Sequence, residues 1–304
     1  MPAEPGARRP RPAPVTASVL RELALPEPGD DKDANGRLLV VGGSTRSPGA
    51  VRLAGEAALR AGAGKVALAT VAPVLAGLGA LVPEAAHLPL ATDDDGGIDL
   101  ADLDAAVAEC RRVDVVLAGP GLVDPAHAVA LLARLAGEVG GSVVLDGLAS
   151  AFLTEHPDGL RTAGIAERAV LSVNPGELAR TAGVEPAAVA ADPAGVAGMV
   201  ARRCGSVVVC GGTAKHVVTP EGSAWVVEGG GPGLASSGSG DVHAGILAGL
   251  LARGAAPAHA AVWAAQVHAR CGERLAARVG PVGYLARELP GEVPAVLCEL
   301  GGAG

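Results

Sequence analysis

The chain has 304 residues, of which 49% are hydrophobic but only 1% aromatic, and its formal net charge at pH 7 is −8. This composition argues against a nucleic-acid-binding protein, which needs a basic face or aromatic side chains on which bases stack. No apolar run reaches the roughly 18 uncharged residues of a membrane span, and the N-terminus lacks the apolar segment of a secretory signal peptide. We therefore expect a cytoplasmic protein that binds neither nucleic acid nor membrane.

Two regions of different composition divide the chain. The first 15 residues are rich in Pro and Arg, which is typical of disordered segments, and we predict a disordered tail over 1–15. No long linker, internal repeat or second change of composition follows. Residues 16–304 are therefore predicted to form one domain.

Short apolar runs alternate with helical patterns along this domain. Strands are predicted over 37–43, 65–71, 113–121, 142–147, from 169 to a turn ending at 177, and over 206–212, 215–222 and 223–229. Helices are predicted over 49–64 and 126–137 and from about 240 onwards. This alternation is typical of the α/β class, with a central, mostly parallel sheet covered by helices on both faces.

Glycines and polar residues follow the ends of four predicted strands. They are Gly42-Gly43-Ser44, Gly119-Pro120-Gly121, Asp146, and Asn174 to Glu177. In open parallel sheets, ligands bind outside the carboxyl ends of the strands. The recurrence predicts one ligand site at this edge of the sheet.

The stretch GLASSGSGDVHAG, at 233–245, combines a glycine-rich turn with the start of a predicted helix. Glycines let a ligand approach the backbone closely, and the N-terminus of a helix attracts anions. Both features favour an anion site formed by the amides of Gly238, Ser239 and Gly240. The carboxylate of Asp241 could then accept a proton from a ligand. The alternative is that Asp241 only caps the helix.

Two further motifs also have alternative interpretations. Asn174 and Glu177 could face a phosphate or a metal-bound water, or could form an ordinary capping box at a helix start. Lys215, close to the glycines at 211 and 212, could meet phosphates or could lie in solvent at a hairpin end. The stretch VVGGSTRSPGA, at 40–50, matches neither the dinucleotide-binding pattern nor the P-loop, and is either a ligand-receiving turn or a structural one.

The histidines and cysteines show no spacing typical of metal ligands, so no metal site made by a direct ligand cluster is predicted.

Four segments, 36–70, 117–122, 174–180 and 233–254, together resemble the ADP-dependent NAD(P)H-hydrate dehydratases of the ribokinase-like superfamily. The resemblance implies a ribokinase-like fold and the repair of hydrated nicotinamide cofactors, NADHX and NADPHX. The ring hydroxyl is phosphorylated from ADP or ATP, and phosphate is then eliminated. It also implies Mg²⁺ with the nucleotide. Some members carry an epimerase domain, for which this chain lacks room, so we expect a stand-alone dehydratase.

The resemblance implies roles for particular residues. Ala50, Gly121 and Asn174 would contact the hydrated cofactor, and Asp241 would deprotonate its hydroxyl. The amides of residues 238–240 would hold the transferring phosphoryl group. The nucleotide would bind Gly240 and the turn made of Gly211, Gly212, Thr213, Ala214 and Lys215. Glu177 and Asp146 would belong to the surroundings of the phosphates and Mg²⁺.

The chain also departs from the family pattern. Asn174 stands where the family commonly has His, Gly211 where its nucleotide turn usually starts with Lys, and Lys215 where it usually has Thr. A second acid commonly found two residues after Asp146 is missing. The Asn-x-x-Glu pattern is used by ribokinase-like kinases of small hydroxylated metabolites, which gives the main alternative function.

A non-catalytic nucleotide-binding protein is a second alternative, and a nicotinamide-dependent oxidoreductase a third. The choice between ADP and ATP stays open with ADP favoured, and so does the choice between NADHX and NADPHX. A homo-oligomer is expected.

Overall fold

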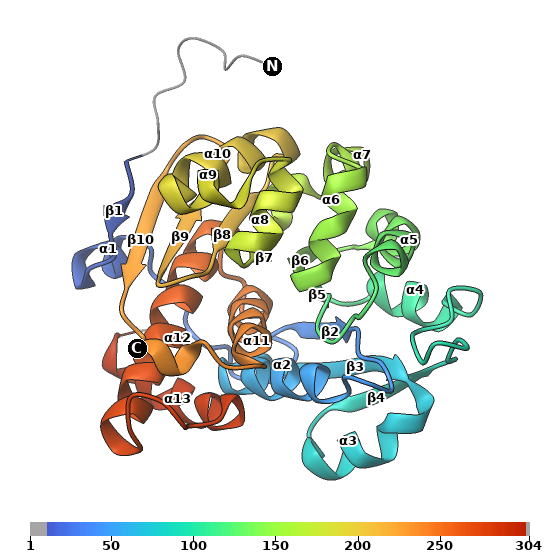
Figure 1. Cartoon of the computed structure of the whole chain (residues 1–304). Coiled ribbons are helices and arrows are strands. Elements are labelled where there is room, and N and C mark those ends of the chain that lie inside the picture. Colours follow the sequence, from blue (N-terminus) through green and yellow to red (C-terminus); the bar gives the residue numbers. More distant parts are fainter. Residues whose placement is uncertain (1–10, 302–304) are drawn as a thin grey trace.

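The computed structural model describes residues 11–301, which form a ten-stranded sheet with helices packed on both faces (Figure 1). The strands are β1 (Ala13–Pro14), β2 (Arg37–Val41), β3 (Lys65–Val71), β4 (Ala86–Leu90), β5 (Val115–Ala118), β6 (Ser142–Asp146), β7 (Ala169–Val173), β8 (Val207–Cys210), β9 (Ala214–Val218) and β10 (Ala224–Glu228). Their order across the sheet is β1-β10-β9-β8-β7-β6-β5-β2-β3-β4.

The sheet is parallel except around β9, which runs antiparallel to both β8 and β10. The turns on either side of β9 are short, and short connections join antiparallel strands, whereas parallel neighbours need a longer crossover. The strands from β5 to β8 are apolar and buried along nearly their whole length, as expected for a sheet covered on both sides. The predicted α/β class is confirmed.

Helices of the two faces bury separate apolar clusters against the sheet. One face carries α1 (Ala17–Glu22), α2 (Gly49–Arg60), α3 (Leu75–Leu81), α11 (Ser239–Ala252), α12 (Pro257–Arg278) and α13 (Leu289–Glu299). The other carries α4 (Asp104–Cys110), α5 (Pro125–Leu135), α6 (Ala151–Glu155), α7 (Gly159–Thr162), α8 (Pro175–Ala182), α9 (Pro186–Ala191) and α10 (Pro193–Cys204). No helix within residues 11–301 is long and apolar enough to cross a membrane.

Helix α11 is buried on all sides between α2 and the sheet. Its small residues allow this approach. A side-chain Cβ added at Gly245 would lie 2.2 Å from the carbonyl oxygen of Ala54, and one added at Gly249 would lie 2.6 Å from that of Ala58. The glycines therefore bring the backbones of α11 and α2 together, which fixes where α11 begins.

The order in which strands are added to the sheet changes side between β2 and β5, which are neighbours. β3 and β4 lie on one side of β2, and the strands from β5 onwards lie on the other. The turns after these strands contact each other, because the N–H of Gly43 donates to the carbonyl of Pro120 at 2.7 Å. Such a switch point leaves a crevice at the carboxyl ends of the strands. The glycine-rich turns that follow β2 and β5 thus lie at the edge where the sequence predicted a ligand.

Some elements differ from the prediction. β3 occupies the predicted range, whereas β4 and helices α8 to α10 were not predicted. Residues 1–10 of the predicted tail lie outside the described residues. At the other end of that tail, Ala13–Pro14 pairs in parallel with β10 at the edge of the sheet.

Candidate active site

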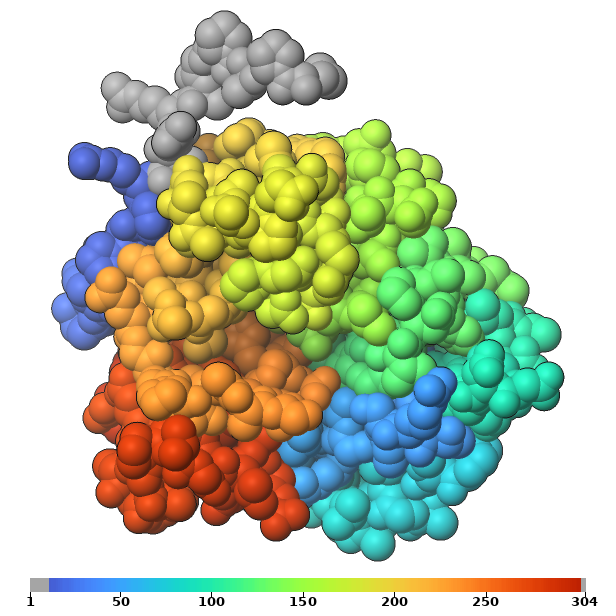
Figure 2. Space-filling model, in the orientation of Figure 1, coloured from blue at the N-terminus to red at the C-terminus, as the bar shows by residue number. Residues whose placement is uncertain are grey.

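A cleft of about 830 Å³ opens at the carboxyl ends of β6, β7 and β8. Its remaining walls are the β8–β9 turn, the segment 229–235 and the first turn of α11. In the space-filling view, the surface is hollowed between the yellow segment of α8 and the orange segment that precedes α11 (Figure 2). The volume lies in the range of sites for small molecules and cofactors.

The start of α11 lies in the wall of this cleft and presents two backbone amides without a backbone acceptor. Gly238 precedes the helix with φ of 89°, a left-handed conformation that favours glycine, and no side chain caps the helix. The N–H of Ser239 donates to the carbonyl of Ser236 at 3.2 Å, and that of Val242 to Gly238 at 3.1 Å. Within the described chain, the amides of Gly240 and Asp241 have no backbone acceptor. Two amides at the positive end of a helix dipole favour an anion.

The amides available to an anion differ in part from the predicted ones, which were those of Gly238, Ser239 and Gly240. Gly238, Ser239 and Gly240 do form the turn as expected, but the amide of Ser239 is engaged within the turn. The amide of Asp241 is free instead.

Asp241 is the third residue of α11, and its carboxylate takes no part in capping. The alternative interpretation of Asp241 as a cap is therefore wrong. The side chain is half-buried, lines the cleft, and forms no hydrogen bond or ion pair with another residue in 11–301. Burial raises its pKa to about 6. A carboxylate with a pKa near the working pH can act as a general base.

Asp146 and Glu177 add two more carboxylates to the same cleft. Burial at the end of β6 raises the pKa of Asp146 well above its usual value, and the negative charges of Asp241 and Glu177 raise it further. A hydrogen bond from Ser172 acts in the opposite direction. Asp241 and Glu177 therefore each lie close enough to Asp146 to disfavour its charged form, and a cation beside Asp146 would offset this effect.

Asn174 and Glu177 form a capping box at the start of α8, which confirms that interpretation. The N–H of Glu177 donates to Oδ1 of Asn174, and the N–H of Asn174 donates to Oε2 of Glu177, both at 2.9 Å. The two side chains also line the cleft. Because only one carboxylate oxygen of Glu177 serves the cap, the other is available to a ligand.

The β8–β9 turn brings Gly211, Gly212, Thr213 and Lys215 to the cleft. Ala214 is not among the lining residues, because successive side chains of a strand point to opposite faces. Lys215 is only 8% exposed, so the interpretation that it lies in solvent is wrong. Burial lowers the pKa of its ammonium to about 8.

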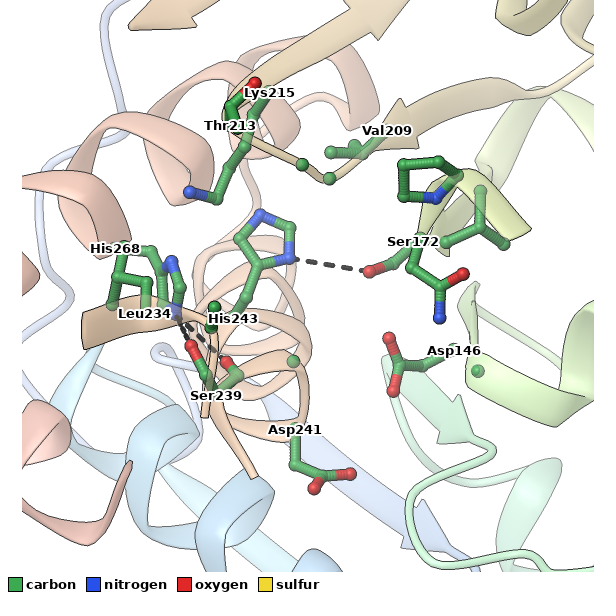
Figure 3. Close-up of a pocket in the computed structure, with 18 of the residues that line it drawn as sticks. Asp146, Ser172, Val209, Thr213, Lys215, Leu234, Ser239, Asp241, His243 and His268 are labelled. Carbon is green, nitrogen blue, oxygen red and sulfur yellow. Dashed lines mark hydrogen bonds between the residues drawn. The ribbon is translucent and has the colours of Figure 1, made fainter. Parts of the chain in front are cut away.

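Two histidines in the cleft were not predicted as site residues. His268, on α12, donates from Nε2 to the carbonyl of Ser239 at 3.0 Å and also lies 3.0 Å from its hydroxyl (Figure 3). Nδ1 of His243, on α11, lies 3.4 Å from the hydroxyl of Ser172. The two rings meet edge to face, with centroids 5.5 Å apart. In the sequence, His243 follows Ser239 by four residues, and this spacing places both side chains on the same face of a helix. The spacing could have indicated that His243 belongs to the site.

Ala50 and Gly121 lie against each other beside the switch point. A Cβ added at Gly121 would lie 3.1 Å from Cβ of Ala50 and 2.9 Å from Cα of Gly43. Neither residue lines the main cleft, and Gly43 and Ser44 line a separate hollow of about 410 Å³. Ala50 and Gly121 are therefore neighbours of each other but lie outside the cleft that Asp241 lines.

No group of three or more His, Cys, Asp or Glu residues suited to hold a metal ion occurs in the described part of the chain.

The fold is shared with proteins of known structure. A ribokinase-like superfamily protein from Enterococcus faecalis superposes with a TM-score of 0.79 at 23% identity, over 95% of this chain and 96% of that one. The ADP/ATP-dependent NAD(P)H-hydrate dehydratase from Bacillus subtilis, co-crystallised with ATP/Mg²⁺, superposes with a TM-score of 0.78 at 25% identity, over 95% and 99%. The protein therefore has a ribokinase-like fold, with two free backbone amides and a carboxylate at the start of α11.

The sequence comparisons narrow this class to one family. Residues 38–295 match the family model of NAD(P)H-hydrate dehydratase, and the chain belongs to this family. It is 45% identical over 293 residues to the ADP-dependent (S)-NAD(P)H-hydrate dehydratase of Xanthomonas campestris, covering 96% of this chain and 98% of that protein. It is also 31% identical to the bifunctional NAD(P)H-hydrate repair enzyme Nnr of Escherichia coli, of whose length it spans 47%.

Proposed function

We propose that this enzyme converts the S form of NAD(P)H hydrate back to NAD(P)H at the expense of a nucleotide, with ADP favoured over ATP. The observation that carries the proposal is the unpaired carboxylate of Asp241 next to the free amides at the start of α11, in a cleft of about 830 Å³. A proton acceptor beside an anion site is the arrangement that phosphoryl transfer to a hydroxyl needs. The similarity to the Xanthomonas campestris dehydratase supports the same substrate.

The residues of the cleft have distinct tasks in this reaction. Asp241 takes the proton of the ring hydroxyl as the hydroxyl oxygen bonds to the terminal phosphorus of the nucleotide. The bond from that phosphorus to the bridging oxygen breaks, and AMP leaves when ADP is the donor. The amides of Gly240 and Asp241 stabilise the charge on the transferring group. The ring carbon–oxygen bond then breaks, phosphate leaves with the electron pair, and loss of a ring proton restores the double bond.

Mg²⁺ would fit beside the nucleotide, where it would neutralise phosphate charge. Asp146 and the free oxygen of Glu177 are hard oxygen ligands, and among the described residues neither side chain forms a salt bridge with Lys or Arg. One or two carboxylates are what Mg²⁺ usually takes from a protein, because substrate phosphates and water complete its shell. A divalent ion there would also offset the repulsion that raises the pKa of Asp146.

The remaining assignments belong to the same proposal. Asn174, Ala50 and Gly121 would contact the hydrated cofactor, and the turn at 211–215 would hold the nucleotide. A cytoplasmic homo-oligomer is also proposed. Its support is a set of exposed apolar side chains within one short segment, Val279, Val282 and Leu285.

The direct test is a repair assay with hydrated NADH. Reduced-nicotinamide absorbance is expected to return only when ADP or ATP is supplied together with the enzyme, and faster with ADP. Hydrated NADPH, tested alongside, shows the preference between the two cofactors. Failure to restore absorbance with either nucleotide would rule out the proposed function.

The capping box of Asn174 and Glu177 favours one alternative, because Asn-x-x-Glu is the pattern of ribokinase-like small-molecule kinases. Such a kinase would consume nucleotide with another hydroxylated acceptor and leave the hydrate unrepaired. The same assay, with nucleotide consumption followed in parallel, separates the two functions.

The pH dependence of repair provides a further prediction. Since the pKa of Asp241 is raised to about 6 and the base must be deprotonated, kcat/KM is expected to rise with pH through about 6. Below that pH it should fall about tenfold per unit, as the carboxylate takes up a proton. Initial rates from pH 5 to 8 check this, and a profile that is flat over this range would contradict the role of Asp241.

A further inference from the structure

Lys215 is a buried cation without a counter-charge. Its side chain enters the cleft from β9 and is only 8% exposed. No ion pair or hydrogen bond joins its ammonium to any residue in 11–301, and burial is the sole cause of its lowered pKa. A charge removed from water without a partner destabilises a fold, so such groups are usually paired or serve a ligand.

Two buried histidines surround this ammonium. His243 is 6% and His268 is 3% exposed, and Nε2 of the first and Nδ1 of the second have no hydrogen-bond partner. Burial lowers the pKa of both rings, and the nearby charge of Lys215 lowers it further. In the close-up, the amine of Lys215 points towards the two rings (Figure 3). Neutral imidazoles do not compensate the ammonium, so the cluster lacks an anion.

The cluster lies on the other side of the anion site from the base. Figure 3 shows His243 and Asp241 on different sides of the start of α11, with Lys215 beyond His243. In phosphoryl transfer, the attacking and leaving oxygens lie roughly in line across the phosphorus. If Asp241 faces the attacking hydroxyl and the amides of α11 hold the phosphoryl group, the leaving group lies towards Lys215.

The β8–β9 turn itself provides no other cation for this position. Cys210, where the turn begins, is buried in the apolar cluster on the opposite face, and its thiol donates to the carbonyl of Gly211. Thr213 is neutral, so the positive charge comes from the next strand.

We propose that Lys215 binds the phosphate of the leaving group, which is the α-phosphate when a nucleoside diphosphate is the donor, with Nε2 of His243 as a second hydrogen-bond donor. In the tautomer that carries its proton on Nε2, His243 can donate to this phosphate, while its Nδ1 lies 3.4 Å from the hydroxyl of Ser172. As the bond to the bridging oxygen breaks, its electron pair stays on the departing nucleoside monophosphate, and Lys215 stabilises that charge. This role rests on the proposed function.

The test is to measure AMP and adenosine binding to the full-length protein by calorimetry, because the two ligands differ only in the α-phosphate. Lys215→Met keeps the length of the side chain and removes its charge. It is expected to weaken AMP binding about 10- to 100-fold, as for a lost charged hydrogen bond, and to leave adenosine binding unchanged. The unliganded variant should melt no lower than the wild type, because it no longer buries an unpaired ammonium. A purely structural lysine would give a lower Tm instead.

Two further variants complete the design. His243→Leu removes the second donor and retains Lys215, and it should weaken AMP binding by a smaller factor, about 2- to 10-fold. Lys32→Met, at an exposed lysine that does not line the cleft, should bind AMP as the wild type does. AMP affinities within twofold of the wild type in both Lys215→Met and His243→Leu would overturn the proposal. Absence of hydrate repair by the wild type would overturn the proposed function instead.

Discussion

Asp241→Asn is expected to lower kcat/KM for hydrate repair by about 10²- to 10⁴-fold, the usual contribution of a general base. The amide has nearly the same shape but does not accept the hydroxyl proton. Since the carboxylate forms no hydrogen bond or ion pair in residues 11–301 and does not cap α11, the fold should be unchanged. Steady-state kinetics with hydrated NADH and ADP measure the loss, and circular dichroism checks the fold.

The matched control for this change is Asp104→Asn, at an exposed carboxylate in the first turn of α4. It removes a charge of the same kind outside the cleft and should repair the hydrate at the wild-type rate. Full activity in Asp241→Asn would show that another group accepts the proton. The rise of activity through about pH 6 should also disappear in this variant, because its cause is removed.

Gly245→Ala is expected to lower the free energy of unfolding by about 3 kcal/mol, the upper part of the range for an overpacked core. The added methyl would lie 2.2 Å from the carbonyl oxygen of Ala54, and backbone on both sides leaves no flexible side chain to move away. The shift of α11 away from α2 would also displace Asp241, so activity should fall at temperatures where the protein stays folded. Urea denaturation and the repair assay measure the two effects.

Gly291→Ala provides the control for backbone effects of glycine. Gly291 lies in α13, is exposed, and has nothing within 4 Å of an added Cβ. Alanine is a better helix former than glycine, so this variant should gain about 0.5–1 kcal/mol. If Gly245→Ala were as stable as Gly291→Ala, the contact between α11 and α2 would not be tight.

The regular part of the fold could be predicted because each buried strand is an apolar run that ends in glycine or a polar residue. β3 coincides with its predicted range although it ends at Val71, because Gly64 before it and Pro73 after it bound the apolar run. β4 was missed because it contains His87 and Pro89 and is only partly buried at the edge of the sheet. β1 was missed because a two-residue strand in a proline-rich stretch has no periodicity, although an edge position tolerates proline.

Two of the four strand-end motifs, Asp146 and the segment from Asn174 to Glu177, reach the main cleft, whereas the turns at 42–44 and 119–121 do not. Asp146, Glu177, Lys215 and Asp241 come from separate segments and all reach one cleft. The burial of Lys215 and its approach to His243 and His268 depend on how β9, α11 and α12 pack. Residues that meet only through tertiary packing leave no common spacing in the sequence, so this cluster could not be predicted.

The close contact between α11 and α2 has a consequence for changing the enzyme's specificity. Asp241, His243 and the amides at the helix start all belong to one buried helix, held by Gly245 and Gly249 and tied to α12 through His268. The groups that we propose to carry the chemistry therefore belong largely to one helix that is packed on all sides. The surrounding walls at 211–215 and 229–235 are turns and loops for the most part. Libraries aimed at a new phosphate donor or acceptor should vary these walls and leave α11 as it is.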